Sequence, residues 1–456
     1  MAREVPNCPR RPSVENMWGN LWTSREYHIQ VITPLFGGGP TPGQNDPVTL
    51  IRGASIRGHL RFWWRATRGA SYPSVAKLRE REAQIWGDTE TPSPVQVMVK
   101  LNRRGRTEPW AEYTPKRDNS GLKSIPDPRN RDFPPYALFP FQGKARGWQV
   151  EEEPAAATQG TEFTLTLRWP TDRELAKDVE AALWAWVNFG GLGARTRRGC
   201  GSLFCSDLAP ADADLRNGHT LAQWVETRCG QYGIELPAEP RPWPTLSRTV
   251  YYALQVDSPL PIWFRAIDLL RRFRQEVNMG RNPGRDGRRP GRSRWPEADS
   301  LRRITGQALP QHQPSITTTA DAFPRAEFGL PIIFHFKDGP RTKTANRSVD
   351  PVDCQLKPAG GAGRMASPLI IKALAVRTGQ GMKAVPLILK LNVEPISAAV
   401  VEFDQGNGPV TCTIDASAIR RQDLANYPNS PLHDRSVQGS AIEGFLYFIQ
   451  KNGFVR

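Results

Sequence analysis

Lysine is scarce in this chain, and so are the features that would place it in or across a membrane. Of its 61 basic residues only 13 are Lys, which leaves 48 Arg. No run of about 18 apolar residues occurs, so no membrane partner or membrane-spanning helix is expected. The N-terminal sequence MAREVPNCPRRPS lacks the apolar stretch of a signal peptide, which predicts a cytoplasmic location.

Metal-ligand and cofactor motifs are also missing. The cysteines form no CxxC pair, and structural zinc sites need closely spaced ligands, so neither a metal nor a cofactor is expected. In a cytoplasmic chain these thiols are expected to be reduced and mostly buried. The six cysteines are Cys8, Cys200, Cys205, Cys229, Cys354 and Cys412.

Catalytic signatures are weak, and no catalytic residue is predicted. No two histidines are spaced as HxxxH, and none lies in a nucleophile motif. His28 and His59 could approach each other and cleave RNA by general acid–base transfer without a metal, although such histidines are more often structural or RNA-contacting. Asp46 could serve as a general base, but a single loop aspartate usually stabilises a turn.

The net charge of the chain points to a nucleic-acid partner. Its 61 Lys and Arg against 45 Asp and Glu give a formal charge of +16 and a pI near 9.9. The guanidinium group binds phosphate in a bidentate manner and stacks on bases, so an Arg-rich basic protein favours RNA or DNA. A high-GC genome, which favours Arg codons, is the alternative explanation. A length of 456 residues predicts two domains, or three.

Hydrophobic periodicity predicts a mixture of strands and helices. Residues 102–160, rich in Pro, Arg and Gly, are expected to leave the compact sheet as a long excursion, and the Arg-dense stretch Arg281–Arg303 has no assigned role. Helices are expected to start at two capping pairs, Thr171 with Glu174 and Ser440 with Glu443. The expected helices are 55–68, 171–186, 262–277 and 440–451. The expected strands are 25–34, 95–101, 161–169, 202–206, 248–254, 330–337, 368–376 and 385–392.

The segment RGASIRGHLRFWWR, from Arg52 to Arg65, has the features of a phosphate-binding helix start. Glycines allow the backbone to approach a ligand, Ser55 can cap the helix, and the free N–H groups of a helix N-terminus attract phosphate. Arginines spaced by four residues line one helical face, and no acid occurs between Arg52 and Arg68. The alternative is a solvated amphipathic helix. The candidate RNA-binding residues are Arg52, Gly53, Ser55, Arg57, His59, Arg61 and Arg65.

A second glycine-rich segment, GGLGARTRRGCG, runs from Gly190 to Gly201. It is not a P-loop, because GxxxxGK[ST] is absent, and it follows a helix and precedes a strand, the reverse of a dinucleotide fingerprint. Backbone amides and arginines in such a loop can hold a ribose-phosphate chain, whereas the alternative is a surface loop that is merely basic. The candidate RNA-binding residues are Gly191, Gly193, Arg195, Arg197 and Arg198.

These motifs, in this order, resemble the RAMP superfamily of CRISPR proteins. The resemblance rests on REYHIQVITPLFGGG, then IRGASIRGHLRFWWRA, then NFGGLGARTRRGCGSL, and it is closest to the family of first Cmr subunits of type III-B effector complexes. The short sequences IWG and RMASPLIIKAL fit that family too. Similarity extends over the first 205 residues and is patchy afterwards.

The resemblance implies an α+β fold with two ferredoxin-like (RRM-like) RAMP domains in tandem, with loop insertions. We expect an N-terminal extension at 1–23 and the two domains at 24–235 and 245–456. The implied partners are CRISPR guide RNA near its 3′ end, target RNA and other Cmr subunits, and the implied role is non-catalytic. A metal-independent endoribonuclease that processes CRISPR precursor RNA and a general RNA-binding protein are the alternatives.

Overall fold

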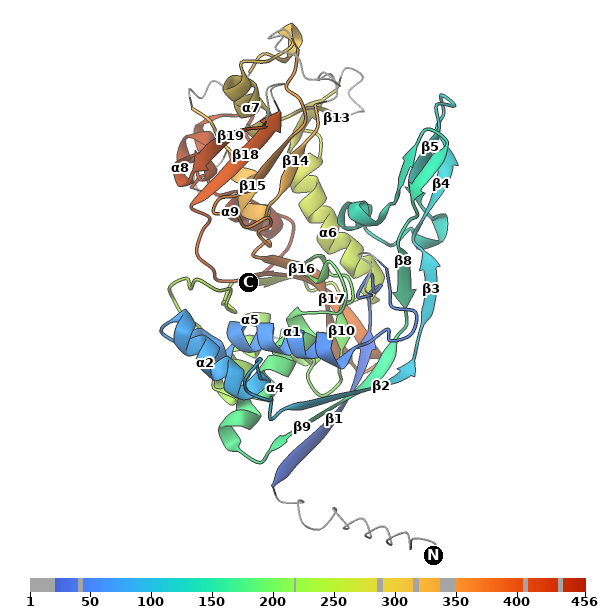
Figure 1. Ribbon diagram of the computed structural model, residues 1–456, viewed down its shortest axis with the longest axis vertical. Helices are drawn as coiled ribbons and strands as arrows, with labels where there is room; N and C mark the ends of the chain where they lie inside the picture. The colour runs from blue at the N-terminus through green and yellow to red at the C-terminus, as the bar shows by residue number, and fades with distance from the viewer. Residues whose placement is uncertain are drawn as a thin grey trace, which may run out of the picture.

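The fold combines helices and antiparallel sheets, as predicted for an α+β protein (Figure 1). The computed structural model describes residues 21–39, 44–216, 219–284, 290–314, 320–336, 349–404, 409–433 and 438–456, so most of the expected extension at 1–23 lies outside the described residues, as do Cys8 and part of the Arg281–Arg303 stretch. No helix in the described ranges is long and apolar enough to cross a bilayer.

The N-terminal part is built on a four-stranded antiparallel sheet with strand order β10-β1-β9-β2. Tyr27 and Ile29 are buried between the sheet and its helices, whereas His28, between them in sequence, is exposed on the other face. The period-two pattern therefore predicted which face is buried. The strands are β1 (Trp22–Val31), β2 (Gln96–Arg103), β9 (Glu162–Pro170) and β10 (Leu203–Phe204).

Two long helices cover the buried face of this sheet, α1 (Gly53–Ala66) after β1 and α4 (Arg173–Phe189) after β9 (Figure 1). The predicted apolar stripe of α4 is buried, but its N-cap is Asp172, which accepts a hydrogen bond from the Leu175 amide at 2.6 Å. The prediction of Thr171 as the cap is wrong by one residue. Two further helices, α2 (Val75–Trp86) and α5 (Leu221–Tyr232), pack beside them.

The excursion at 102–160 forms an ordered arm. It contains three pairs of antiparallel strands, and Trp110, Phe133 and Phe141 are buried in a hydrophobic cluster that the arm shares with the C-terminal part. In Figure 1 the arm rises beside helix α6 (Pro259–Gln275), and the ring of Phe133 lies 6.0 Å from that of Trp263 in α6. The arm elements are β3 (Arg106–Pro109), β4 (Ala111–Pro115), β5 (Leu122–Pro126), α3 (Pro135–Leu138), β6 (Lys144–Arg146), β7 (Gln149–Glu152) and β8 (Ala156–Gln159).

The C-terminal part contains a three-stranded sheet, β11-β17-β16, to which Val455 is added by an antiparallel bridge with Tyr252. A separate four-stranded sheet has the order β14-β15-β18-β19. The strands expected in this part form, and Ser440 caps the last helix by accepting from the Glu443 amide at 3.2 Å. The elements are β11 (Val250–Tyr252), β12 (Arg281–Pro283), β13 (Pro290–Ser293), α7 (Glu297–Thr305), β14 (Ile332–Phe334), β15 (Cys354–Pro358), β16 (Leu369–Thr378), β17 (Gly381–Lys390), β18 (Ala398–Asp404), β19 (Pro409–Asp415), α8 (Ala416–Ile419) and α9 (Ala441–Lys451).

Strand β16 joins the two parts of the chain in one core. Ile370 and Leu374 on one face belong to the hydrophobic cluster that contains α4, whereas Ile371 and Ala373 on the other face pack with α6 and α9. A strand covered on both faces reads as a continuous apolar run, which is how PLIIKALAV reads. The two parts are therefore held together by buried apolar surface.

Candidate functional site

The glycine run at residues 37–39, here called the first glycine-rich segment, and the second glycine-rich segment at 190–201 meet the N-terminus of α1 at one cavity of about 330 Å³, here called the glycine-loop cavity. Four candidate residues line this cavity together: Arg52, Ser55 and His59 from the start of α1, and Gly193 from a segment far away in sequence. No acidic residue is among its lining residues. The lining is Leu35, Gly37, Gly38, Gly39, Leu50, Ile51, Arg52, Ser55, His59, Leu192, Gly193 and Ala194.

Main-chain contacts hold the two segments together. The amide of Ala194 donates to the Phe36 carbonyl at 2.7 Å, and Gly193 has a φ of +77°. A Cβ atom at Gly193 would lie 2.5 Å from that carbonyl oxygen, so only glycine permits this approach. Gly191 lies deeper in the same loop, and its carbonyl accepts from the Trp186 indole at 3.0 Å.

The start of α1 differs from the prediction. The helix begins at Gly53, with Arg52 as an N-cap that makes no side-chain capping bond, so Ser55 lies in the first turn and is not the cap. The Ser55 side chain lines the cavity instead. The Arg52 guanidinium donates to the Gly38 carbonyl, which joins the helix start to the first glycine segment. First-turn N–H groups without an intrahelical partner, together with the helix dipole, favour an anion here.

His59 lies one turn further along α1 and reaches the same cavity. Its ring stacks on Trp186 with the centroids 6.0 Å apart, and burial lowers the pKa of this imidazole. His59 is therefore favoured in its neutral form, which can donate one hydrogen bond and stack against a base.

The remaining arginines of α1 do not form the uncompensated stripe that their spacing suggested. Arg61 and Arg65 both form ion pairs with Glu82 of α2, at 2.7 and 2.6 Å, and the Glu82 side chain is only 5% exposed. Arg68 pairs with Asp178 of α4 at 2.7 Å. Arg57 lies against the Val95 carbonyl, 3.5 Å away. No acid lies between positions 52 and 68 of the sequence, but acids from α2 and α4 form ion pairs with these arginines.

The arginines of the second loop face the C-terminal part. Arg197 donates to the Ser367 carbonyl, and Arg198 donates to the Leu369 carbonyl at 2.9 Å, at the start of β16. Arg195 has a left-handed backbone conformation with a φ of +58°. The alternative of a surface loop that is merely basic therefore does not fit Arg197 and Arg198, which contribute to the junction between the two parts.

The positions of His28, His59 and Asp46 do not support a catalytic role. His28 is exposed on the uncovered face of the sheet, where its ring nitrogen lies 3.2 Å from the Thr164 hydroxyl, whereas His59 belongs to α1 on the opposite face. The two histidines therefore do not form a pair. Asp46 accepts hydrogen bonds from the amides of Thr49 and Val48, which lower the pKa of its carboxyl group. It therefore stabilises a turn, which is the usual role of a single loop aspartate.

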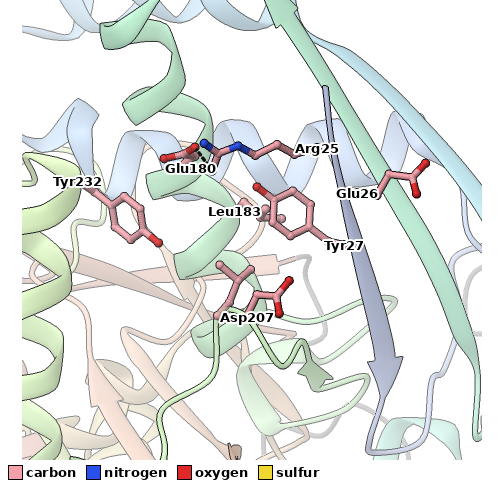
Figure 2. A pocket seen from close by; sticks show the side chains of 8 residues that line it. Arg25, Glu26, Tyr27, Glu180, Leu183, Asp207 and Tyr232 are labelled. Carbon is pink, nitrogen blue, oxygen red and sulfur yellow. Dashed lines mark ion pairs between the residues drawn. The ribbon is translucent and has the colours of Figure 1, made fainter. Parts of the chain in front are cut away.

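A second cavity, of about 340 Å³, lies between β1, α4 and α5 (Figure 2). Figure 2 shows Arg25 paired with Glu180 at 2.6 Å, close to the side chains of Tyr27 and Tyr232. Burial raises the pKa of Tyr27 to about 12, so its hydroxyl stays protonated. The cavity also includes Glu26 and Asp207, which gives it three acids against one arginine. This acidic lining disfavours phosphate.

The cysteines of the described residues are free thiols. Cys200, Cys205, Cys229 and Cys354 are buried free thiols, and Cys412 is half-buried, as expected of a reduced protein. Burial raises the pKa of Cys200 to about 12, which keeps it protonated and unreactive. Within the described ranges, no three His, Cys, Asp or Glu side chains gather closely enough to hold a metal ion.

Two residues that the sequence did not single out contribute to the site. Lys372 of β16 donates to the Gly190 carbonyl from a fully buried position. Arg274, near the end of α6, lies close to the second glycine loop. The only signal for Lys372 was a lone charge inside the apolar run PLIIKALAV, and Arg274 was one of several arginines on its helix.

The N-terminal part of the chain is similar to proteins of a known family. Residues 28–204, which include both glycine-rich segments and α1, match the RAMP superfamily model. The N-terminal part is therefore a RAMP-superfamily domain. Pyrococcus furiosus has two similar proteins, CRISPR system Cmr subunits Cmr1-2 and Cmr1-1. Cmr1-2 is 26% identical over 183 residues, which cover 39% of this chain and 92% of that relative. Cmr1-1 is 34% identical over 154 residues, which cover 34% of this chain and 40% of that relative.

The chain is thus similar to Cmr1 subunits of CRISPR systems, and its N-terminal part to the RAMP superfamily, as its motifs indicated. Among solved structures, a chain of the type III-B Cmr-beta complex bound to cognate target RNA aligns with a TM-score of 0.42 and 12% identity, over 83% of this chain and 96% of that one.

Proposed function

We propose that this protein is a non-catalytic, RNA-binding subunit of a type III-B CRISPR effector complex. It caps one end of the complex and contacts the guide RNA near its 3′ end together with target RNA. The similarity to the two Cmr1 subunits supports membership of such a complex. Other Cmr subunits are then its protein partners, and the complex acts in antiviral defence inside the cytoplasm.

We further infer two tandem ferredoxin-like units, at 24–235 and 245–456. In the N-terminal part the strands, counted along the chain without the arm, have the order 4-1-3-2 with helices after the first and third. In the C-terminal part β11, β16 and β17 have the order 1-3-2, and Val455 bridges to the outer side of β11 in the place of a fourth strand. The arm and the sheet β14-β15-β18-β19 are then insertions.

The observation that carries the RNA-binding proposal is the convergence of two glycine-rich segments on the N-terminus of α1. The cavity offers free helix amides, the Ser55 hydroxyl and the neutral His59 ring, with Arg52 at its edge and no carboxylate. Such a lining suits a phosphodiester with an adjoining ribose or base. It recognises backbone and shape, so sequence specificity would come from base pairing between guide and target.

The test is the salt dependence of RNA affinity, measured by fluorescence anisotropy on the purified full-length protein. The logarithm of the association constant should fall with the logarithm of salt concentration, with a slope of roughly −0.7 per phosphate neutralised. Arg52→Ala should weaken binding of unrelated RNA sequences about equally. Arg79→Ala, an exposed arginine of α2, is the charge-matched control and should bind like wild type. Salt-independent binding, or equal losses in both variants, would contradict the proposal.

Two alternatives are outcomes of further tests. Isolated protein should leave CRISPR repeat RNA intact with or without divalent metal. Cleavage that His28→Ala or His59→Ala abolishes would instead support a processing endoribonuclease. Purification from the native host should recover other Cmr subunits, whereas recovery of RNA without them would favour a general RNA-binding protein.

A further inference from the structure

A third cavity, here called the junction cavity, lies where the chain between the two parts meets the strands of the C-terminal part. Its volume is about 480 Å³. Its walls come from the chain at 240–244, from the loop at 364–368 before β16 and from the stretch 390–396 at the end of β17. It shares no lining residue with the glycine-loop cavity, so it is a separate site.

Main-chain hydrogen bonds hold two of these walls in place. Thr245 and Asn392 each donate an amide to the other's carbonyl at 2.8 Å, which ties the chain between the two parts to the end of β17. On the opposite side Leu330 and Met365 exchange two such bonds, of 2.9 and 3.0 Å. The cavity is therefore formed before any partner binds, and a partner would lose little affinity to the ordering of its walls.

Much of the lining is aliphatic. Leu391 and Ile442 are buried at the cavity, whereas Val393 and Ile396 are only half-buried and leave apolar surface open to a partner. No aromatic side chain is among the described residues that line it. Proteins that bind single-stranded RNA stack the bases on aromatic rings, so this lining suits aliphatic side chains better than bases.

The charged part of the lining is mainly basic. Arg420 is paired with Glu327 at 2.6 Å, and Lys390 is paired with Glu443 at 2.5 Å. Glu327 also accepts a hydrogen bond from the Ile442 amide at 3.3 Å, so a carboxylate already occupies the N-terminus of α9. The charged lining residues are Arg197, Arg364, Lys390 and Arg420 against Glu327 and Glu394.

The other two basic residues of the lining have no carboxylate partner among the described residues. Arg197 donates to the Ser367 carbonyl, and its guanidinium carbon lies 5.6 Å from the ring centroid of Phe62. Arg364 is exposed at the mouth of the cavity and forms no ion pair within the described ranges. Two unpaired guanidinium groups beside aliphatic walls are complementary to a ligand that combines carboxylates with aliphatic side chains.

We propose that the junction cavity docks a segment of a neighbouring protein subunit in which acidic residues flank aliphatic ones. The aliphatic side chains fill the cavity, and the carboxylates pair with Arg364 and Arg197. The inference rests on the proposed membership of a Cmr complex and deepens it, because it names a surface and the chemistry of the partner. A protein segment is favoured over RNA because the lining has no aromatic ring for a base, and Glu327 already fills the nearby helix N-terminus that a phosphate would use.

The first experiment is photo-crosslinking in the assembled effector complex. Ala366 is an exposed lining residue, and it is replaced by the photo-crosslinker p-benzoylphenylalanine. The same replacement at Ala76, an exposed alanine of α2, is the matched control. Mass spectrometry should identify a crosslink from position 366 to one other subunit, in a segment of acidic and aliphatic residues, and position 76 should not give this crosslink. Crosslinks from position 366 to RNA, to a second copy of this chain or to nothing would overturn the inference.

The second experiment reverses the charge at the cavity mouth. In titrations onto effector complex assembled without this subunit, Arg364→Glu should lose about tenfold in affinity, whereas Arg79→Glu on α2 should stay within about twofold of wild type. Both side chains are exposed, so both variants should melt like wild type. Changing the crosslinked acid of the partner to Arg should restore the affinity of Arg364→Glu. Equal affinities of the two variants, or no restoration, would contradict the inference.

The outcomes separate this inference from the proposed function. If the wild type co-purifies with other Cmr subunits but position 366 crosslinks to none of them, the junction cavity is not the docking surface and the proposed function stands. If the wild type does not assemble with other Cmr subunits, the proposed function itself fails.

Discussion

Lys372 donates a hydrogen bond to the carbonyl oxygen of Gly190, 2.7 Å away, from a position on β16 that solvent does not reach. The amine crosses from the C-terminal part to the first glycine of the second loop, and no carboxylate pairs with it among the described residues. Burial lowers the pKa of Lys372 from 10.5 to about 7. The junction between the two parts therefore contains a group that titrates near neutral pH.

This lysine predicts a pH dependence of stability. Between pH 7 and pH 10.5 the unfolded chain holds a proton that the folded protein has released, so the free energy of unfolding should rise with pH across that window. The rise should amount to a few kcal/mol, roughly 1.4 kcal/mol per pH unit. Chemical denaturation of wild type and Lys372→Met measures it, because the difference between them cancels the other titrating groups. Parallel pH profiles would contradict the prediction.

Glu82 predicts a structural role for the arginines of α1. Glu82→Gln should lower the free energy of unfolding by about 1–3 kcal/mol, a value reduced from that of a fully buried pair because Arg61 and Arg65 are about one-third exposed. Arg61→Ala should cost only about 1 kcal/mol, since Arg65 still pairs with the carboxylate. Glu80→Gln, on the exposed side of α2, is the control for urea denaturation and should be neutral. Equal effects at positions 80 and 82 would argue against this role.

Trp64 combines packing with a polar contact. Its ring is fully buried, and its indole donates to Asp178 at 2.9 Å. Trp64→Ala should destabilise the protein by about 3–5 kcal/mol through the cavity it leaves. Trp64→Phe keeps much of the volume but loses the donor, and should cost about 1–2 kcal/mol because Arg68 and Arg81 still bind Asp178. Denaturation curves that place the two variants together would show that volume is not the cause.

Asp350 predicts sensitivity to acid in the C-terminal part. Burial alone would raise the pKa of Asp350, but hydrogen bonds from Arg302 at 2.9 Å and His312 at 2.5 Å outweigh it, and the pKa lies below 3.8. A carboxyl group with a lowered folded pKa contributes stability above its unfolded value and loses it as the pH falls through the folded one. Asp350→Asn should therefore cost about 2–4 kcal/mol at neutral pH.

The difference between wild type and Asp350→Asn should shrink as the pH falls below 3.8. Asp353→Asn is the matched control, since its ion pair with His335 is exposed and should contribute little. Thermal melts from pH 3 to pH 7 test both variants. A constant difference across this range would contradict the prediction, because it would mean that folding leaves the pKa of Asp350 unchanged.

The local elements of the fold could be read from the sequence because their signals are local. Alternation placed Tyr27 and Ile29 inside and His28 outside, and Ser440 and Glu443 marked the start of the last helix. Errors arose where two neighbouring residues could play the same part, as with Thr171 and Asp172 at the start of α4. Each side chain can accept from an amide, but the Thr171 hydroxyl lies 3.3 Å from that of Thr23, and Asp172 accepts from the Leu175 amide.

By itself the sequence determined the two glycine-rich segments, the helix that follows the first of them and the excess of arginine. Glycine content, helical periodicity and charge are properties of a single stretch of chain, so they can be read without knowing how the stretches pack. Only the tertiary structure decided which of these arginines are engaged by other elements of the fold. Glu82 lies 17 residues beyond Arg65, and Leu369 lies 171 residues beyond Arg198. An ion pair or a hydrogen bond between elements depends on how they pack, and spacing along one helix carries no information about it.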